Sequence, residues 1–445
     1  MINRYFGTDG IRARFGEWPL SPHGLSVIAN GIRKYLHAKK ISSVAIGCDT
    51  RSSCKEIELR ICSELEKCPI DVKILGVIST PMMSFCAMTG GAELGIMISA
   101  SHNPYEYNGI KMFDRFGNKF SLGDEAELEE FFDEVAAGDC GRSRVSYRAE
   151  KGSTYHMQDD FVLRYKNFLL GNMAHALEGL SIVVDCANGS YSNIARDVMK
   201  SLGAKSCVSI ADAPSGLNIN YECGATRPLL AQRTVLETRS DMGMCFDGDG
   251  DRVIFIDERG RVIGGDQIIA YIAKKVGLEG TAGVVGTEMS NKGLEFFVTG
   301  LSMGFSRTLV GDRFVSEELS KRGWKIGGEP SGHVILKEFL PTGDGLLVGA
   351  YVAGLVASCR GVASEVLNVF FPFAQVLFNM PIEKVNPFAV EDAKSRGAFL
   401  NLLGCDGRIS IRKSGTEPVL RIMVEAETHE HANETARAIA KFISA

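Results

Sequence analysis

Residues 94–113 read Leu-Gly-Ile-Met-Ile-Ser-Ala-Ser-His-Asn-Pro-Tyr-Glu-Tyr-Asn-Gly-Ile-Lys-Met-Phe. The first apolar run predicts a short buried strand. Pro104 ends it, because proline removes a backbone donor and biases the preceding residue away from helix. Ser101 therefore lies in a polar loop at the carboxyl end of a strand, where open α/β sheets bind ligands. Cationic neighbours such as His102 and Lys111 would suit a serine that carries a phosphoryl group, although the loop also fits a plain turn.

This pattern of strands and loops occurs three times along the chain. In each copy two strands separated by a helical segment precede a third strand, which ends in a polar loop that contains glycine. The third strands are expected at 96–98, 242–246 and 324–326. Strands that alternate with helices indicate parallel sheets joined by crossover helices, and matching units indicate related domains.

We therefore predict an α/β protein with three similar mixed α/β domains around a central cleft and a smaller C-terminal α+β domain. The predicted domains are 1–155, 156–258, 259–372 and 373–445. In the last domain, strands are expected at 375–379, 408–412 and 420–425, and a helix is expected at 430–443.

Composition limits the classes of partner. The chain has 445 residues, 45% hydrophobic and 23% charged, which is typical of a globular protein with several domains. A net charge of −5 argues against nucleic-acid binding. Without an apolar N-terminal signal or a span longer than the uncharged stretch 345–359, we expect no membrane association. The 12 cysteines form no Cys-x-x-Cys pair, which indicates the reduced thiols of a cytoplasmic protein. A homodimer is left open.

Three carboxylates alternate with glycines at Asp247, Asp249 and Asp251. Alternate residues of an extended segment point the same way, so these carboxylates can converge on one hard cation. The spacing resembles the start of an EF-hand, but the apolar segment 253–256 that follows predicts a strand instead of the rest of that loop. We therefore predict a Mg²⁺ site here, followed directly by Arg252.

Two further loops concentrate polar groups. Residues 327–333, Gly-Gly-Glu-Pro-Ser-Gly-His, suit the recognition of sugar hydroxyls through Glu329, Ser331 and His333. Residues 412–418, Arg-Lys-Ser-Gly-Thr-Glu-Pro, combine cations, hydroxyls and backbone amides, as an anion-binding nest does. Each loop is also compatible with a structural turn.

Shorter matches occur elsewhere. Residues 6–12, Phe-Gly-Thr-Asp-Gly-Ile-Arg, place Arg12 after a glycine-rich turn, where it can meet a phosphate. Asp49-Thr50-Arg51 and Gly311-Asp312-Arg313 suit helix caps as well as ligand contacts.

Together these loops resemble those of the α-D-phosphohexomutases over nearly the whole chain. That family carries the same Phe-Gly-Thr-Asp-Gly-Ile-Arg opening and Ser-Ala-Ser-His-Asn-Pro loop, followed by Asp-Gly-Asp-x-Asp-Arg, Gly-Glu-x-Ser-Gly-His and Arg-x-Ser-Gly-Thr-Glu-Pro. The chain departs from the family at Ala13, where glycine is usual, and at Pro330, where glutamine is common, so its sugar preference stays open.

The resemblance implies a phosphohexomutase that acts on a small-molecule sugar phosphate, with a hexosamine bisphosphate as primer and intermediate. Ser101 would carry the phosphoryl group and share one Mg²⁺ with the three aspartates. Lys111 is the first candidate for general acid or base and His333 the second. The other groups expected around the reaction are Arg12, His102 and Arg252. Glu329 and Ser331 would bind the sugar, and the phosphate would be held by Arg412, Ser414, Gly415 and Thr416.

Within this family, the sequences of the loops and the length of the chain favour glucosamine 6-phosphate and glucosamine 1-phosphate as the interconverted pair. This reaction would lie on the way to UDP-N-acetylglucosamine. Mannose or glucose phosphates are the alternative on the same scaffold. A catalytically inactive sugar-phosphate-binding protein is the alternative from another class, but it would not need a phosphoryl carrier at Ser101. Because a bisphosphate must turn over between two transfers, the C-terminal domain is expected to move.

Overall fold

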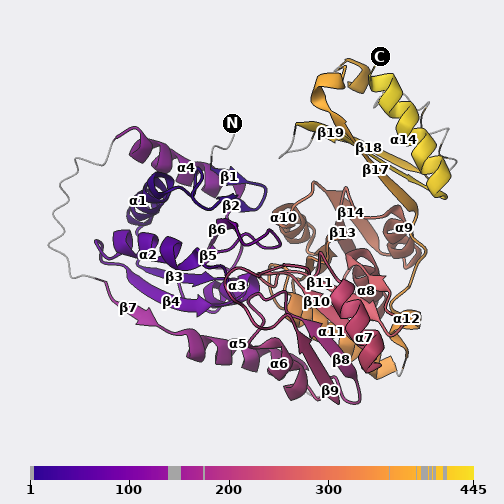
Figure 1. Ribbon diagram of the computed structural model, residues 1–445, viewed down its shortest axis with the longest axis horizontal. Helices are drawn as coiled ribbons and strands as arrows, with labels where there is room; N and C mark the ends of the chain where they lie inside the picture. Colours follow the sequence, from indigo (N-terminus) through magenta and orange to yellow (C-terminus); the bar gives the residue numbers. More distant parts are fainter. Residues whose placement is uncertain are drawn as a thin grey trace.

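Four β-sheets follow one another along the chain in the computed structural model (Figure 1). The structure describes residues 5–138, 152–173, 176–359, 361–386, 388–391, 399, 403, 407–413 and 418–444. The first sheet has the order β1-β2-β6-β5-β3-β4-β7. Its strands are β1 Phe6–Gly7, β2 Gly10–Arg14, β3 Ser43–Cys48, β4 Asp71–Val77, β5 Leu94–Ile98, β6 Tyr107–Phe113 and β7 Thr154–His156. Its helices are α1 Pro22–Ala38, α2 Cys54–Leu65, α3 Thr80–Met88 and α4 Leu122–Ala136.

The second sheet has the order β12-β11-β10-β8-β9 and the third β14-β13-β15-β16. The second region comprises α5 Gln158–Met173, β8 Ser181–Asp185, α6 Ala195–Ser201, β9 Ser206–Ile210, α7 Leu229–Thr238, β10 Met242–Phe246, β11 Val253–Asp257 and β12 Val262–Ile263. The third comprises α8 Gly265–Gly280, β13 Gly283–Thr287, α9 Lys292–Gly300, β14 Gly304–Thr308, α10 Asp312–Arg322, β15 Ile326–Gly328, β16 Val334–Leu336, α11 Gly345–Cys359 and α12 Ala363–Val366.

Strand order confirms the predicted repeat. Four strands of each sheet follow the same order, namely β6-β5-β3-β4, β11-β10-β8-β9 and β16-β15-β13-β14. The last three of each set are parallel, as predicted. The first is antiparallel to its neighbour, so each polar loop is a hairpin connection and the sheets are mixed.

The C-terminal sheet is small and entirely antiparallel, with the order β17-β19-β18. Its elements are β17 Ala374–Pro381, the 3₁₀ helix η1 Ile382–Lys384, β18 Arg408–Lys413, β19 Val419–Ala426 and α14 His429–Ile443. The strands and the helix predicted for this region are confirmed. One face of the sheet buries Ile422 and Val424 against Ala436 and Ile439 of α14.

Serine caps begin three of the helices. Ser21, Ser79 and Ser121 each accept a hydrogen bond from a backbone N–H in the first turn of α1, α3 and α4. Such a cap stabilises a helix by about 1 kcal/mol. The uncharged stretch predicted to be a buried helix is α11, and no helix among the described residues is long and apolar enough to cross a bilayer. The ten described cysteines are free thiols.

The largest cluster of buried apolar residues extends over the first three sheets, whereas the C-terminal unit has a separate core. One continuous core joins the first three sheets and includes Met83 of α3, Tyr165 of α5, Phe246 of β10 and Leu346 of α11. The C-terminal sheet and α14 have a core of their own. In Figure 1 this last unit stands over β13, β14 and α9, apart from the first sheet. Shared packing fixes the first three sheets relative to one another. The C-terminal unit contacts the third domain through hydrogen bonds such as those from Arg408 to the carbonyls of Glu288 and Ser290.

Candidate active site

A cavity of about 370 Å³ lies where the three hairpin loops meet. Its walls come from the turn between β1 and β2, the loops after β5, β10 and β15, and the start of α10. The predicted site residues that line it are Arg12, His102, Asp251, Arg252, Glu329 and His333. The fold therefore brings together groups that are more than 300 positions apart in the sequence.

Ser101 is fully buried beside this cavity. Its backbone has a φ of +52°, a left-handed conformation that is uncommon for a residue other than glycine and is found at functional sites. Its Oγ donates a 2.7 Å hydrogen bond to Oδ2 of Asp247, and its backbone N–H donates to Oγ of Ser99 at 2.9 Å. The serine hydroxyl thus points at the aspartate loop of the second sheet.

Arg51 binds the backbone of the loop that contains Ser101. Its guanidinium donates to the carbonyls of Ser101, Asn103 and Tyr107 at 3.0, 2.7 and 2.9 Å, and it pairs with Asp49 at 3.0 Å. The side chain is completely buried. Between the two roles left open for this residue, the geometry supports the structural one, because Arg51 bonds to Asp49 and to backbone carbonyls of the serine loop.

Asp247, Asp249 and Asp251 converge as the alternation predicts. Each offers an oxygen within 4.8 Å of the others, and all three side chains are buried. Within the described part of the chain, Oδ1 of Asp249 and Oδ1 of Asp251 have no hydrogen-bond partner. Leaving buried carboxylate oxygens unpaired is costly. Burial and the two neighbouring carboxylates raise the pKa of Asp247 well above its usual value. A hard divalent cation fits this donor set and would relieve both effects.

Lys111 lies among these carboxylates. Its Nζ is 2.8 Å from Oδ2 of Asp249, 3.1 Å from Oδ2 of Asp9 and 3.4 Å from Oδ2 of Asp251. Burial alone lowers the pKa of an ammonium, but these carboxylates outweigh it and raise the pKa of Lys111 well above its usual value. The residue is therefore a buried ammonium.

His102 differs from the sequence expectation. Its Nδ1 is 3.5 Å from Oγ of Ser101, at the limit of a hydrogen bond. Burial, together with the charges of Arg252 and Arg12, lowers the pKa of His102 to about 4. The imidazole is thus neutral at neutral pH, and the expectation of a cationic His102 is wrong. The arginines that suppress its charge supply positive potential in its place.

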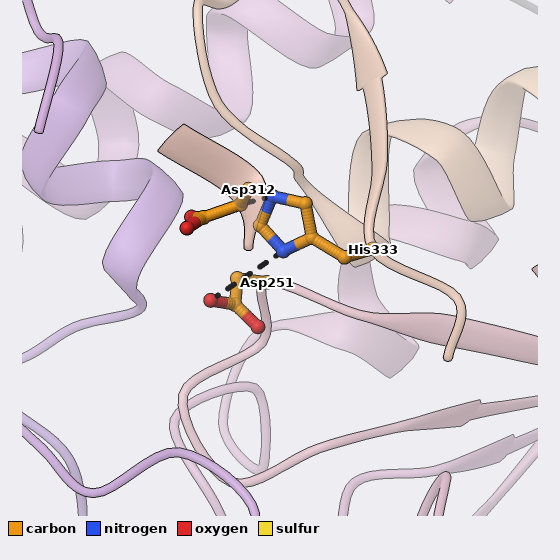
Figure 2. Close-up of side chains that lie close together, drawn as sticks. All are labelled: Asp251, Asp312 and His333. Atoms are coloured by element: carbon orange, nitrogen blue, oxygen red, sulfur yellow. Dashed lines mark ion pairs between the residues drawn. The ribbon is translucent and has the colours of Figure 1, made fainter. Parts of the chain in front are cut away.

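His333 lies between two carboxylates (Figure 2). Its Nδ1 is 3.6 Å from Oδ2 of Asp251, and its Nε2 is 3.6 Å from Oδ2 of Asp312. The backbone N–H of Gly343 donates to Nε2 at 3.1 Å. Burial alone lowers the pKa of His333, but the carboxylates of Asp251 and Asp312 outweigh it and raise the pKa above its usual value.

The loop after β15 places Glu329 in the cavity wall. Its Oε1 accepts from the N–H of Gly311 at 2.9 Å, and Ser331 donates to Oε2 at 3.2 Å. Pro330 is not among the described residues that line this cavity, and its carbonyl accepts from the N–H of Gly265 at 3.1 Å. Pro330, where the chain departs from the family, lines a different cavity together with Gly264 and Phe370.

Arg412 lies in β18 of the C-terminal sheet, directly opposite Arg421 of β19. Side chains of directly opposite residues share one face of the sheet, and like charges there repel each other. An anion bound on this face would relieve the repulsion. The predicted phosphate-binding residues Ser414, Gly415 and Thr416 lie outside the described residues.

Sequence reasoning missed two charged residues of this site. Asp9 lines the cavity and belongs to the segment 6–12, so its position three residues before Arg12 could have indicated it. Lys119 contacts both Asp9 and Asp312, and no motif in the sequence indicated it. Asp312 itself had been left open between a helix cap and a ligand contact.

Family models cover almost the entire chain. Residues 3–138, 160–260 and 264–372 match the alpha/beta/alpha domains I, II and III of phosphoglucomutase/phosphomannomutase, and residues 380–442 match its C-terminal domain. The chain belongs to this family. The resemblance to the phosphohexomutases and the predicted architecture of three α/β domains plus a smaller one are confirmed.

Two relatives that match this phosphohexomutase over its full length are named phosphoglucosamine mutase. Phosphoglucosamine mutase 2 of Shewanella frigidimarina is 38% identical over 455 residues, covering 100% of both chains. Phosphoglucosamine mutase of Idiomarina loihiensis is 40% identical over 449 residues, covering 99% of this chain and 98% of the relative.

Solved structures show the same fold at lower identity. A phosphoglucomutase/phosphomannomutase family protein of Burkholderia thailandensis has a TM-score of 0.82 at 23% identity and covers 98% of this phosphohexomutase and 97% of that chain. N-acetylphosphoglucosamine mutase of Aspergillus fumigatus, solved with GlcNAc-6P and magnesium, has a TM-score of 0.66 at 17% identity and covers 99% and 95%.

Proposed function

We propose that this phosphohexomutase is a phosphoglucosamine mutase, which interconverts glucosamine 6-phosphate and glucosamine 1-phosphate and so feeds UDP-N-acetylglucosamine synthesis. The observation that carries the chemistry is the 2.7 Å hydrogen bond that places the Ser101 hydroxyl against the buried aspartate cluster. The choice of sugar is supported by full-length relatives at 38–40% identity that bear this name.

In this proposal Ser101 carries the phosphoryl group, and the free hydroxyl of the sugar monophosphate receives it. Asp247, Asp249 and Asp251 would hold one Mg²⁺ together with the seryl phosphate, and the bound ion would supply charge neutralisation. Arg12 and Arg252, both in the cavity wall, would bind oxygens of the transferring group through charge-assisted hydrogen bonds. Positioning and electrostatics account for most of the catalysis of phosphoryl transfer.

The two candidates for general acid or base, Lys111 and His333, have different surroundings. Lys111, as a buried ammonium, can donate a proton to the seryl oxygen as the phosphoryl group leaves, and the lysine can then take up the proton that the attacking sugar hydroxyl releases. Both ring nitrogens of His333 already face partners, Asp251 on one side and Gly343 on the other. We therefore assign Lys111 the acid role and His333 the role of holding Asp251. Glu329, oriented by Ser331, would bind sugar hydroxyls.

The C-terminal domain would hold the phosphate that does not react. Arg412 and its cross-strand neighbour Arg421 provide two guanidinium groups beside the predicted loop. The resulting glucosamine bisphosphate must reverse its orientation between the two transfers, which a separate core allows by letting this domain move. The domain boundaries at 155, 258 and 372, a homodimer and a cytoplasmic location remain proposals.

A substrate panel tests the function. The purified protein is given Mg²⁺, a hexose bisphosphate primer and the 6-phosphates of glucosamine, glucose and mannose in separate reactions, and the 1-phosphates are quantified. We expect the highest kcat/KM with glucosamine 6-phosphate. A higher kcat/KM with glucose or mannose 6-phosphate would move the protein to the alternative substrates. Tight binding of all three without turnover would identify an inactive sugar-phosphate-binding protein.

A further inference from the structure

Lys119 joins loops from different domains at the edge of the active site. Its Nζ is 2.6 Å from Oδ1 of Asp9, forms an ion pair with Oδ2 of Asp312, and lies 4.0 Å from Oδ2 of Asp251. Asp9 belongs to the turn between β1 and β2, Asp312 begins α10, and Asp251 follows β10. The side chain of Lys119 is only 9% exposed, so one buried ammonium connects the first three domains.

Each carboxylate that Lys119 contacts also holds a group assigned to the reaction. The second oxygen of Asp9 pairs with Arg12 and lies 3.1 Å from Nζ of Lys111. The oxygen of Asp312 that pairs with Lys119 faces Nε2 of His333 at 3.6 Å. The group Asp251, Asp312 and His333 is close enough to hold a metal ion, but the Lys119 ammonium already neutralises Asp312.

Lys119 itself is separated from the cavity by these partners, because Asp9 and Asp312 line the cavity and Lys119 is not among its lining residues. Without the ammonium, Asp9 and Asp312 would lose the cation that lies between them, and each would turn toward the cations that remain. Asp9 would then shift toward Arg12 and Lys111, and Asp312 toward His333. Displacements of about 1 Å at such groups cost about 10²-fold in rate.

The same domain interface contains a second ion pair that serves as a control. Arg313 forms a bidentate, buried pair with Glu125 of α4, with one contact at 2.7 Å. This pair also joins the first domain to the third, and among the described residues Glu125 makes no hydrogen bond or ion pair with Asp9 or Asp312. Removing it weakens the interface without releasing the carboxylates of the site.

We propose that Lys119 is a positioning residue, which aligns Arg12, Lys111 and His333 by holding Asp9 and Asp312 across the boundary between the first and third domains. This inference rests on the proposed mutase function for its assay. Lys119 lies outside the loops by which the family is recognised. In this proposal, the positions of the reacting groups depend on an ion pair between domains.

The test compares Lys119→Met, Lys119→Arg and Glu125→Gln with the wild type. Each variant is assayed with the hexose or hexosamine phosphate that the wild type converts fastest. If the wild type does not convert glucosamine 6-phosphate, the proposed substrate is wrong, and the role of Lys119 is then measured with the sugar phosphate that the wild type does convert. We expect Lys119→Met to lower kcat about 100-fold with KM within about threefold, because the sugar's own phosphate is bound elsewhere. Lys119→Arg should recover at least about tenfold, since it keeps the charge.

The thermal midpoint separates positioning from interface stability. Glu125→Gln should lower Tm while its kcat stays within about threefold of the wild type. If Lys119→Met folds poorly, Asp312→Asn removes the same ion pair with less change in volume, and it should also lower kcat with little effect on KM. A wild-type kcat in Lys119→Met, or an equal loss of kcat in Glu125→Gln, would overturn the proposal.

Discussion

Ser101 and Asp247 lie 146 positions apart, yet the serine hydroxyl donates a 2.7 Å hydrogen bond to the aspartate carboxylate. The first and second sheets have equivalent strand orders, and β5 corresponds to β10. The two sheets thus meet through the loops that follow these two strands. Both groups are buried. The contact requires the first two domains to keep a fixed relation, which their shared apolar core provides.

Replacing Ser101 tests this contact directly. Ser101→Ala removes the hydroxyl that bonds to Asp247, so the protein should lose both mutase activity and phosphorylation by a bisphosphate primer. Intact-protein and peptide mass spectrometry after priming should locate one added phosphoryl group on Ser101 in the wild type. Retention of full activity by the alanine variant would show that another residue carries the group.

A glycine at the same position separates chemistry from folding. With a φ of +52°, Ser101 occupies a conformation that costs an L-residue about 1–2 kcal/mol. Ser101→Gly should therefore be inactive like the alanine variant but have a higher free energy of unfolding. Chemical denaturation of the two variants provides the comparison.

The sequence allowed the chemistry-bearing loops and the strands before them to be predicted, because apolar runs, glycines and alternating aspartates are local patterns. It did not allow the prediction of which side chains meet across domains. Lys119 follows a hairpin turn and carries no motif, and its importance comes from Asp9 and Asp312, which lie 110 and 193 positions away. Tertiary proximity of this kind has no local signature.

The protonation states of the site residues also could not be predicted from the sequence. His102 beside Ser101 suggested a cation, but in the folded protein burial and two arginines lower its pKa to about 4. The neighbours responsible come from other loops, so the sequence near His102 could not reveal its charge. The antiparallel hairpins that end each repeat were missed for a related reason, since the alternation of strands and helices that indicates parallel sheets does not show how the last strand returns.

The aspartate cluster predicts stabilisation by a divalent cation in the absence of substrate. Adding Mg²⁺ at about 100 times its Kd should stabilise the wild type by about 2.7 kcal/mol, seen as a higher Tm in differential scanning fluorimetry. Asp249→Asn should abolish most of this shift and lower kcat strongly. Asp257→Asn, which alters a buried carboxylate of β11 outside the cluster, is the control and should keep the Mg²⁺ shift. An unchanged Mg²⁺ response in Asp249→Asn would rule out the site.

A pH effect is expected at the joint with the C-terminal domain. Asp266 accepts a 2.7 Å hydrogen bond from the N–H of Asn291, and Asn291 in turn exchanges hydrogen bonds with Phe373 just before β17. Burial raises the pKa of Asp266 to about 7. The native state therefore binds a proton that the unfolded chain has lost, so the free energy of unfolding falls as pH rises from about 4 to about 7.

Asp266→Asn should remove this dependence. Between pH 5 and 8, the stability of the variant relative to the wild type should rise by on the order of 2 kcal/mol, measured by urea denaturation at each pH. Asp197→Asn, which removes an exposed carboxylate of α6, is the control and should follow the wild type. A constant difference between Asp266→Asn and the wild type across this range would contradict the expected titration.

Arg412 separates substrate positioning from phosphoryl chemistry, because it belongs to a domain with its own core. It lies opposite Arg421 on one face of the C-terminal sheet, where two guanidinium groups favour a bound phosphate. Arg412→Ala should lower kcat/KM for the sugar phosphate by about 10²-fold, as expected from a lost charged hydrogen bond and poorer orientation. Ser101 and the aspartates are untouched by the change, so priming of Ser101 by a small phosphoryl donor should continue.

The neighbouring residue supplies the matched control. Lys413 follows Arg412 in β18, and successive side chains of a strand point to opposite faces, so Lys413→Ala removes an equal charge from the other side of the sheet. Its kcat/KM should remain close to that of the wild type. Arg412→Ala should also release bisphosphate during turnover and depend more on added bisphosphate, because the intermediate must be retained while it reverses. If Arg412→Ala and Lys413→Ala had equal kcat/KM and equal bisphosphate dependence, Arg412 would be a structural residue of the strand, and the C-terminal domain could not be assigned the second phosphate through it.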